Sequence, residues 1–282
     1  MDKAICVPVA IVAAMLLPSR FSPAMEPKPS IYAQGVQATL NRQFPSSSVS
    51  YLLLDAHSGE ILAERWANAE TSIPVGSLIK PFTALAYAQS HRRFPAVICH
   101  GQRDLCWLPK GHGRMTLETA IAQSCNAYFH SLARELSVQQ ANAVLIEFGL
   151  PPVDAANKTS ALVGLSSDWQ VSSLTLARAY ARLARGTATR TNSEIFSGMR
   201  QSAKVGTARA VSLALPAGAA LAKTGTAQCT HTPRATADGF TVVLFPVDDP
   251  RIVLLSRVHG VTGATTASTA AQMLQALEAG QP

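Results

Sequence analysis

Pro74-Val75-Gly76-Ser77-Leu78-Ile79-Lys80-Pro81-Phe82 is the stretch of sequence around which the rest of the chain can be interpreted. Its first three residues are typical of an irregular segment, and from Leu78 onward the pattern predicts a helix, so Ser77 lies at a helix N-terminus. Pro81 falls in the first turn, where its missing N–H costs no intrahelical bond. Residues three apart share a helix face, so Lys80 can reach the Ser77 hydroxyl.

A serine hydroxyl is a weak nucleophile until a base removes its proton, and a buried lysine with a lowered pKa can be that base. The helix N-terminus also disfavours the charged ammonium form. Ser77 and Lys80 are therefore a candidate nucleophile and base. The alternative is a helix-capping serine beside an ordinary surface lysine, and this stretch by itself favours that alternative.

A second motif, Ser124-Cys125-Asn126, lies where one helical pattern (116–123) meets another (127–136). Serine and asparagine disfavour helix interiors and suit such junctions. There Ser124 can relay a proton between Lys80 and a leaving group, and Asn126 can donate a hydrogen bond to a substrate. An N-cap with a neighbouring polar turn is the competing interpretation.

A third motif, Lys223-Thr224-Gly225-Thr226, lies in a predicted strand. Residues two apart share a face of a strand, so Thr224 and Thr226 can present their hydroxyls together to a carboxylate. Gly225 allows a ligand to approach the backbone closely, and Lys223 supplies a positive charge for an anionic substrate. An edge strand with a solubilising lysine would explain this motif equally well if it stood alone.

The fold class predicted from the patterns is α+β: an antiparallel sheet from the N- and C-terminal thirds, flanked by helices, with an inserted all-helical lobe. Alternating and β-rich segments predict strands at 49–55, 60–66, 220–227, 239–245 and 252–259. Helical patterns occupy 31–42, 78–91, 116–136 (broken near Ser124), 138–148, 175–185 and 266–278.

The three motifs occur in a fixed order, and the sequence around them resembles one family. Over nearly its whole mature length the chain resembles the transpeptidase domain of penicillin-binding proteins, in the penicillin-recognising serine acyltransferase and serine β-lactamase-like superfamily. The segments that carry the resemblance are 54–63, 74–82, 115–129, 173–181 and 238–246. Two features depart from the family pattern: Ala222 replaces the usual glycine before Lys223, and the interval from Asn126 to Lys223 is short.

The resemblance implies a two-step acyl transfer on peptidoglycan stem peptides. Ser77 would attack the penultimate D-alanine carbonyl, expel the terminal D-alanine and hold an acyl-enzyme, which an amine (transpeptidase) or water (carboxypeptidase or endopeptidase) would resolve. By the same resemblance, backbone N–H groups of Ser77 and Thr226 form the oxyanion hole, and β-lactams act as covalent inhibitors at Ser77. Cell-envelope protein partners are also expected, and no cofactor is.

Two other classes of function remain open at this point. A serine β-lactamase would share the first and third motifs but needs a fast deacylating base, and no Glu-x-x-Leu-Asn segment follows Ser124. A non-catalytic sensor that binds β-lactams or muropeptides would keep the fold. The lifetime of the acylated protein separates these classes from a cell-wall acyltransferase.

The composition is that of a globular protein, and the N-terminus predicts export. The chain has 282 residues, 48% of them hydrophobic and 15% charged, with a formal net charge of +7. No basic run interleaved with aromatic residues indicates nucleic-acid binding. Residues 1–24 are predicted to be a signal peptide, 25–34 a linker and 35–282 the transpeptidase-like domain, which places the protein in the periplasm or cell envelope. If uncleaved, the leader would anchor the protein to the membrane.

Four cysteines remain after removal of the signal peptide, and an oxidising compartment allows them to pair. Cys99 and Cys106 flank one glycine-containing loop, so a local disulfide between them is expected. A metal site is the rival interpretation because His100 and His112 are near, but the spacing matches no common zinc pattern, and no metal is expected. Cys125 is interpreted as a small packed residue.

Overall fold

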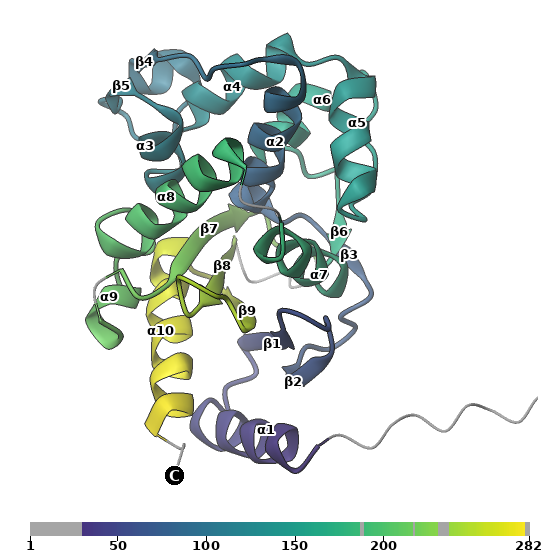
Figure 1. Ribbon diagram of the computed structural model, residues 1–282, viewed down its shortest axis with the longest axis vertical. Coiled ribbons are helices and arrows are strands. Elements are labelled where there is room, and N and C mark those ends of the chain that lie inside the picture. The colour runs from purple at the N-terminus through teal and green to yellow at the C-terminus, as the bar shows by residue number, and fades with distance from the viewer. Residues whose placement is uncertain (1–29, 187–188, 217, 231–236, 280–282) are drawn as a thin grey trace, which may run out of the picture.

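The computed structural model describes residues 30–186, 189–216, 218–230 and 237–279 (Figure 1). The predicted signal peptide lies outside the described residues. Within the described part, the helices are all too short or too polar to span a lipid bilayer.

The architecture is the α+β arrangement expected from the sequence. Five antiparallel strands form the central sheet in the order β2-β1-β9-β8-β7. The first and last thirds of the chain supply the strands: β1 (Val49–Asp55), β2 (Ile61–Arg65), β7 (Leu221–Ala227), β8 (Asp238–Phe245) and β9 (Ile252–His259). Strand β7, which carries the third motif, is therefore an edge strand paired only with β8 within this sheet.

Both faces of the sheet are buried, which explains the continuous apolar run in β1. Side chains alternate along a strand: Tyr51 and Leu53 join the core on one face, and Leu52 and Leu54 join the core on the other. The first face is covered by α1 (Ile31–Gln43), α9 (Val211–Ala214) and α10 (Gly263–Ala279). The second is covered by α7 (Ser173–Ala184) and, at β7 and β8, by the 3-10 helix η1 (Gly76–Ile79), which leads into α2 (Lys80–Ser90) in the region above the sheet (Figure 1).

The middle of the chain forms the predicted helical lobe above the sheet (Figure 1). Its helices are α3 (Leu117–Ala122), α4 (Asn126–Glu135), α5 (Val138–Glu147) and α6 (Lys158–Val163). The lobe also holds a feature that the sequence patterns did not indicate, a two-stranded sheet of β4 (Val97–Cys99) and β5 (Gly113–Met115) joined through the 3-10 helix η2 (Gly101–Asp104). A second short sheet pairs β3 (Ser72–Ile73) with β6 (Val171–Ser172).

Helix α8 (Arg190–Lys204) was not predicted from the sequence, although its signals are visible in retrospect. Thr189 caps its N-terminus by accepting from the Asn192 N–H, and Ile195 and Met199 lie on its buried face. The helix is rich in serine and has few apolar residues, so its helical periodicity is weak in the sequence. The helix packs against α3, whose C-terminal end leads directly into the second motif.

The contact between α8 and α3 depends on Gly198. A Cβ atom there would lie 2.8 Å from the Ile121 Cβ and 2.9 Å from the Glu118 carbonyl oxygen. We expect Gly198→Ala to lower the free energy of unfolding by about 1–3 kcal/mol, because the two helices must move apart. Gly35→Ala is the matched control, since Gly35 is also helical and has no neighbour within 4 Å. The Gly35→Ala substitution should raise the free energy of unfolding by about 0.5–1 kcal/mol, because alanine favours a helix more than glycine does. Urea unfolding of both variants tests this, and equal effects would contradict the packing argument.

Candidate active site

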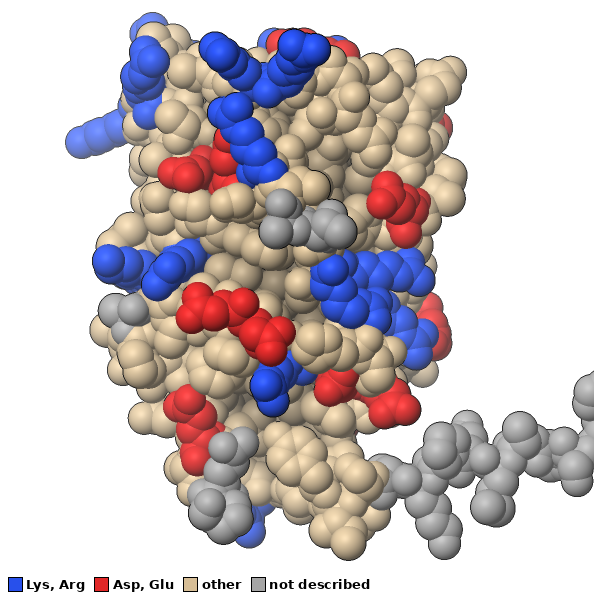
Figure 2. All heavy atoms as spheres, in the orientation of Figure 1, with Lys and Arg blue, Asp and Glu red and all other residues tan. Residues whose placement is uncertain are grey.

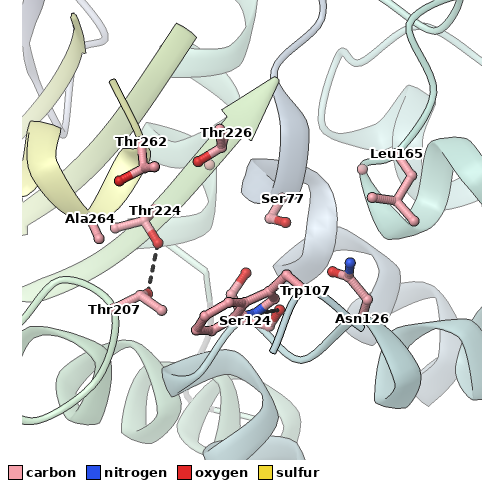
Figure 3. A pocket seen from close by; sticks show the side chains of 12 residues that line it. Ser77, Trp107, Ser124, Asn126, Leu165, Thr207, Thr224, Thr226, Thr262 and Ala264 are labelled. Atoms are coloured by element: carbon pink, nitrogen blue, oxygen red, sulfur yellow. Dashed lines mark hydrogen bonds between the residues drawn. The ribbon is translucent and has the colours of Figure 1, made fainter. Parts of the chain in front are cut away.

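A cavity of about 240 Å³ brings all three motifs together at the junction of the sheet and the helical lobe. Ser77, Ser124, Asn126, Thr224, Gly225 and Thr226 all line it (Figure 3). Lys80 and Lys223 lie behind the cavity wall and are fully buried. The residues predicted separately from three distant segments thus form one site.

Ser77 lies in the 3-10 helix η1 (Gly76–Ile79), which leads straight into α2. Gly76 lets two other segments approach the nucleophile closely: its φ is +60°, and a Cβ there would lie 2.4 Å from the Thr226 carbonyl oxygen. A Cβ on Gly164 would lie 2.3 Å from the Gly76 oxygen, and one on Gly225 would lie 2.6 Å from the Val75 oxygen. The backbones of η1, β7 and the end of α6 are thereby held in contact around Ser77.

Ser124 occupies a turn whose geometry aims its hydroxyl into the site. Helix α3 ends with the Cys125 N–H donating to the Ala120 carbonyl at 2.9 Å and the Ser124 N–H donating to Ile121 at 3.2 Å, the two bonds of a Schellman motif. Ser124 therefore takes the left-handed conformation, with φ of +53°. Glycine is the usual residue at this position. A non-glycine residue held in this conformation is typical of a functional site.

Lys80 is held by the second motif. Its Nζ donates to Asn126 Oδ1 at 2.6 Å, to the Ser124 carbonyl at 2.8 Å and to Ser124 Oγ at 3.3 Å. Burial lowers the pKa of Lys80 to about 7, against the opposing effect of the Cys125 and Cys106 sulfurs. These bonds use all three donors of the ammonium group. The neutral amine has only two donors and a lone pair, so in that form Lys80 gives up one of these bonds and can accept a proton. Among the described residues, no hydrogen bond joins Lys80 Nζ to the Ser77 hydroxyl, which lines the cavity beside Ser124.

Lys223 also binds Ser124. Its Nζ donates to Ser124 Oγ at 2.9 Å and to the Thr224 carbonyl at 2.8 Å. Burial and the nearby Lys80 hold the pKa of Lys223 well below its usual range. The Ser124 hydroxyl therefore lies between two buried lysines, in the position of a group that can pass a proton from one to the other.

The hydroxyls of the third motif face the cavity from β7, as their alternate positions predicted (Figure 3). Thr226 Oγ1 accepts from the Gly263 N–H at 2.9 Å, so its own proton can be donated to a ligand. Thr224 Oγ1 donates to Thr207 Oγ1 at 2.7 Å. The Thr226 hydroxyl therefore gives this side of the cavity a donor suited to an anionic group, whereas the Thr224 proton is engaged by Thr207.

Several residues of the site carried no recognisable signal in the sequence. Trp107 is 52% exposed, lines the cavity and donates through Nε1 to the carbonyls of Gln123 at 3.1 Å and Ser124 at 3.2 Å. Thr207, between α8 and α9, also lines it. The remaining unpredicted lining residues are Gly164, Leu165, Thr262 and Ala264. All of these residues except Ala264, which lies in the first turn of α10, come from loops, where no periodicity marks the inward-facing positions.

The prediction of a disulfide between Cys99 and Cys106 is wrong. Both are free thiols in the structure, as is Cys125. The physical reason is that the loop places His112 against both sulfur atoms, with Nδ1 3.6 Å from Cys99 Sγ and 3.4 Å from Cys106 Sγ. The Cys106 sulfur also lies 3.9 Å from that of Cys125.

This fold and this cluster of a serine, two lysines, a second serine and an asparagine define the penicillin-recognising class of serine acyltransferases. The model of the penicillin-binding protein transpeptidase domain matches residues 49–277. The chain therefore belongs to the penicillin-binding protein transpeptidase domain family. No curated protein sequence matches the chain.

Solved structures of similar fold include three from different bacteria. Pseudomonas aeruginosa PBP2, in complex with WCK 5153, is 18% identical with a TM-score of 0.72, over 87% of this chain and 73% of that one. Helicobacter pylori PBP2, in complex with MreC, is 16% identical with a TM-score of 0.73, over 87% of this chain and 63% of that one. The transpeptidase domain of the Legionella pneumophila D,D-transpeptidase FtsI4 is 20% identical with a TM-score of 0.63, over 88% of this chain and 93% of that one.

Proposed function

We propose that this protein is a serine D,D-acyltransferase that acts on peptidoglycan stem peptides through a covalent intermediate on Ser77. The observation that carries the proposal is the Ser124 hydroxyl held between two buried lysines, 3.3 Å from Lys80 Nζ and 2.9 Å from Lys223 Nζ, beside Ser77. Such a chain of proton carriers is costly to bury without a use.

In the first step, neutral Lys80 takes the Ser77 proton as Oγ attacks the penultimate D-alanine carbonyl. The N–H groups of Ser77 and Thr226 stabilise the resulting oxyanion, each contributing about 10²–10³ in rate in comparable sites. The proton then passes through Ser124 to the nitrogen of the departing D-alanine. The Thr226 hydroxyl donates to the terminal carboxylate of the peptide, and the Thr224 hydroxyl does so by turning its proton away from Thr207. Lys223, when protonated, adds a positive charge behind these two groups.

In the second step, an amine or water attacks the ester on Ser77, and the same groups move the protons in the reverse direction. The described residues that line the cavity include no aspartate or glutamate. A fast β-lactamase requires a strong base for water at this stage, so we expect the acyl-enzyme formed with a β-lactam to persist. This feature favours the cell-wall acyltransferase over the β-lactamase.

The test of this function is release of D-alanine from a stem pentapeptide that ends in D-Ala-D-Ala, measured with and without an added amine acceptor. We expect Ser77-dependent release in both cases. A higher-mass ligated product in the presence of the amine identifies a transpeptidase, and hydrolysis alone identifies a carboxypeptidase. If Ser77→Ala releases D-alanine as fast as the wild type, the proposal fails.

The pH dependence of acylation follows from the lowered pKa of Lys80, which is about 7. Lys80 is the base only when it is neutral, so below about pH 7 the rate should fall by about tenfold per pH unit, and above it the rate should level off. Acylation by a fluorescent penicillin, followed between about pH 5.5 and 8.5, measures this profile. A rate that does not change across this range would show that Lys80 is not the base.

We also propose that the protein is exported, since its substrate would lie outside the cytoplasm. The sequence supports this with its apolar N-terminal stretch and the small residues before Met25. N-terminal sequencing of protein isolated from envelope fractions should begin at Met25, whereas an intact Met1 in a membrane fraction would indicate an anchor. A protein partner in the envelope is part of the same proposal.

A further inference from the structure

A second cluster of reactive side chains lies directly behind the active site and is not used by the acyl transfer. It consists of Cys99 at the end of β4, Cys106 and His112 in the loop to β5, and Cys125 within the second motif. The three thiols and one ring nitrogen all lie within 4.8 Å of one another. The three cysteines are buried and His112 is half-buried. The other nearby histidine, His100, is engaged elsewhere, by Asp104 at 3.0 Å.

Three of the six separations within the cluster match those between the ligands of one tetrahedral ion, and the other three are no longer than 4.8 Å. Zinc bound at about 2.3 Å from sulfur and about 2.0–2.1 Å from nitrogen requires about 3.8 Å between two sulfurs and about 3.5 Å between sulfur and nitrogen. Cys106 Sγ and Cys125 Sγ are 3.9 Å apart. His112 Nδ1 is 3.6 Å from Cys99 Sγ and 3.4 Å from Cys106 Sγ. We propose that Cys99, Cys106, His112 and Cys125 bind one structural zinc ion.

The surroundings are those of a thiolate site. The backbone N–H groups of Leu108, Asn126 and Ala127 lie near the sulfur of Cys106, and that of Tyr128 lies near the sulfur of Cys125. Donors of this kind stabilise the thiolate that binds a metal, as partners outside the ligand shell commonly do. On binding, three thiol protons pass to solvent, and the neutral His112 ring binds through Nδ1 and keeps its proton on Nε2. Three sulfurs and one nitrogen in a tetrahedron are typical of zinc.

The loop is built to bring these ligands together. Gly101 and Gly111 both have positive φ, and a Cβ on Gly111 would lie 2.2 Å from the Cys99 carbonyl oxygen. Only glycine permits this crossing, which folds the loop back so that Cys99 and His112 meet. A disulfide between any two of the three thiols would leave the third thiol and the histidine unused, so a single ion accounts for all four residues.

The site would fasten the loop to the second motif. Cys125 stands between Ser124 and Asn126, and the loop supplies the Leu105 carbonyl that accepts from Asn126 Nδ2 at 3.3 Å. It also carries Trp107, which donates to the Ser124 carbonyl. The zinc ligands are thus positioning residues for Ser124 and Asn126, a role that rests on the proposed acyl transfer. Zinc binding itself does not depend on that function.

The first test measures zinc directly, without any substrate. Protein purified without chelator and with its thiols reduced should contain about one zinc per chain by elemental analysis. Cobalt in place of zinc should give the visible absorption of a tetrahedral thiolate site. Cys99→Ser and His112→Ala should lose metal affinity by at least tenfold, and His57→Ala, which changes an exposed histidine outside the cluster, should not. A reduced wild-type chain that cannot compete with the dye 4-(2-pyridylazo)resorcinol for zinc overturns the proposal. A wild-type mass showing a disulfide among these three cysteines overturns it as well.

The second test concerns positioning. Removing zinc by chelation under reducing conditions should slow acylation of Ser77 by a penicillin at least tenfold, and restoring zinc should recover the rate. Unchanged acylation by a metal-free chain would refute the positioning role. If the zinc content is as expected but the wild type is never acylated, the proposed function fails and the metal site stands.

Discussion

Replacing Lys80 with methionine is expected to lower the rate of acylation by a penicillin by about 10²–10⁴-fold, the usual contribution of a general base. Lys80 is fully buried, and its pKa of about 7 allows it to accept the Ser77 proton near neutral pH. Methionine keeps most of the side-chain volume, so the change removes the amine without opening a large cavity. The measurement is the second-order rate of acylation by a fluorescent penicillin.

Lys204→Met is the matched control for this experiment. Lys204 is exposed at the C-terminal end of α8, away from the cavity, so its loss should change neither acylation nor folding by much. Thermal unfolding of both variants would separate a chemical effect from a structural one. A folded Lys80→Met protein that acylates at the wild-type rate would remove Lys80 from the mechanism.

Replacing Gly76 with alanine is expected to lower the acylation rate by about 10²–10³-fold, the value of one oxyanion-hole donor. The added Cβ would lie 2.4 Å from the Thr226 carbonyl oxygen, a distance that requires β7 or η1 to move. Either movement separates the N–H groups of Ser77 and Thr226, which are proposed to bind the oxyanion together. The nucleophile and both lysines are left intact.

Gly59→Ala isolates the steric part of this effect. Gly59 also has a positive φ, of +75°, but a Cβ there would meet nothing within 4 Å. Both substitutions carry the backbone cost of a left-handed alanine, about 1–2 kcal/mol. Only Gly76→Ala should impair acylation. Equal acylation rates in the two variants would show that the approach of β7 to η1 has no part in the reaction.

The residues that could be predicted from the sequence are those whose function requires a fixed local spacing. Ser77 and Lys80 share a helix turn, and Thr224 and Thr226 share a strand face, so their relation is set by three or four residues of backbone. The central strands could also be predicted from the sequence. Because both faces of the sheet are buried, a strand such as β1 appears in the sequence as a continuous apolar run.

What the sequence could not indicate depends on contacts between distant segments. The four cluster residues are spread over 99–125 without a closely spaced pair, so only the folded loop reveals that they meet. The same holds for Trp107 and Thr207, which enter the cavity from loops. The net charge of +7 does not by itself locate a binding surface. On the face shown in Figure 2, basic and acidic side chains are interspersed and form no continuous basic patch.

The central claim is that Ser77 forms a covalent acyl-enzyme, and intact-protein mass after exposure to a penicillin tests it most directly. The mature wild type should gain the mass of one penicillin and keep it for minutes to hours, and Ser77→Ala should gain none. Consumption of the drug without a lasting adduct would instead identify a β-lactamase. If the wild type and Ser77→Ala both remain unmodified, or both are labelled alike, Ser77 is not the nucleophile and the account is contradicted.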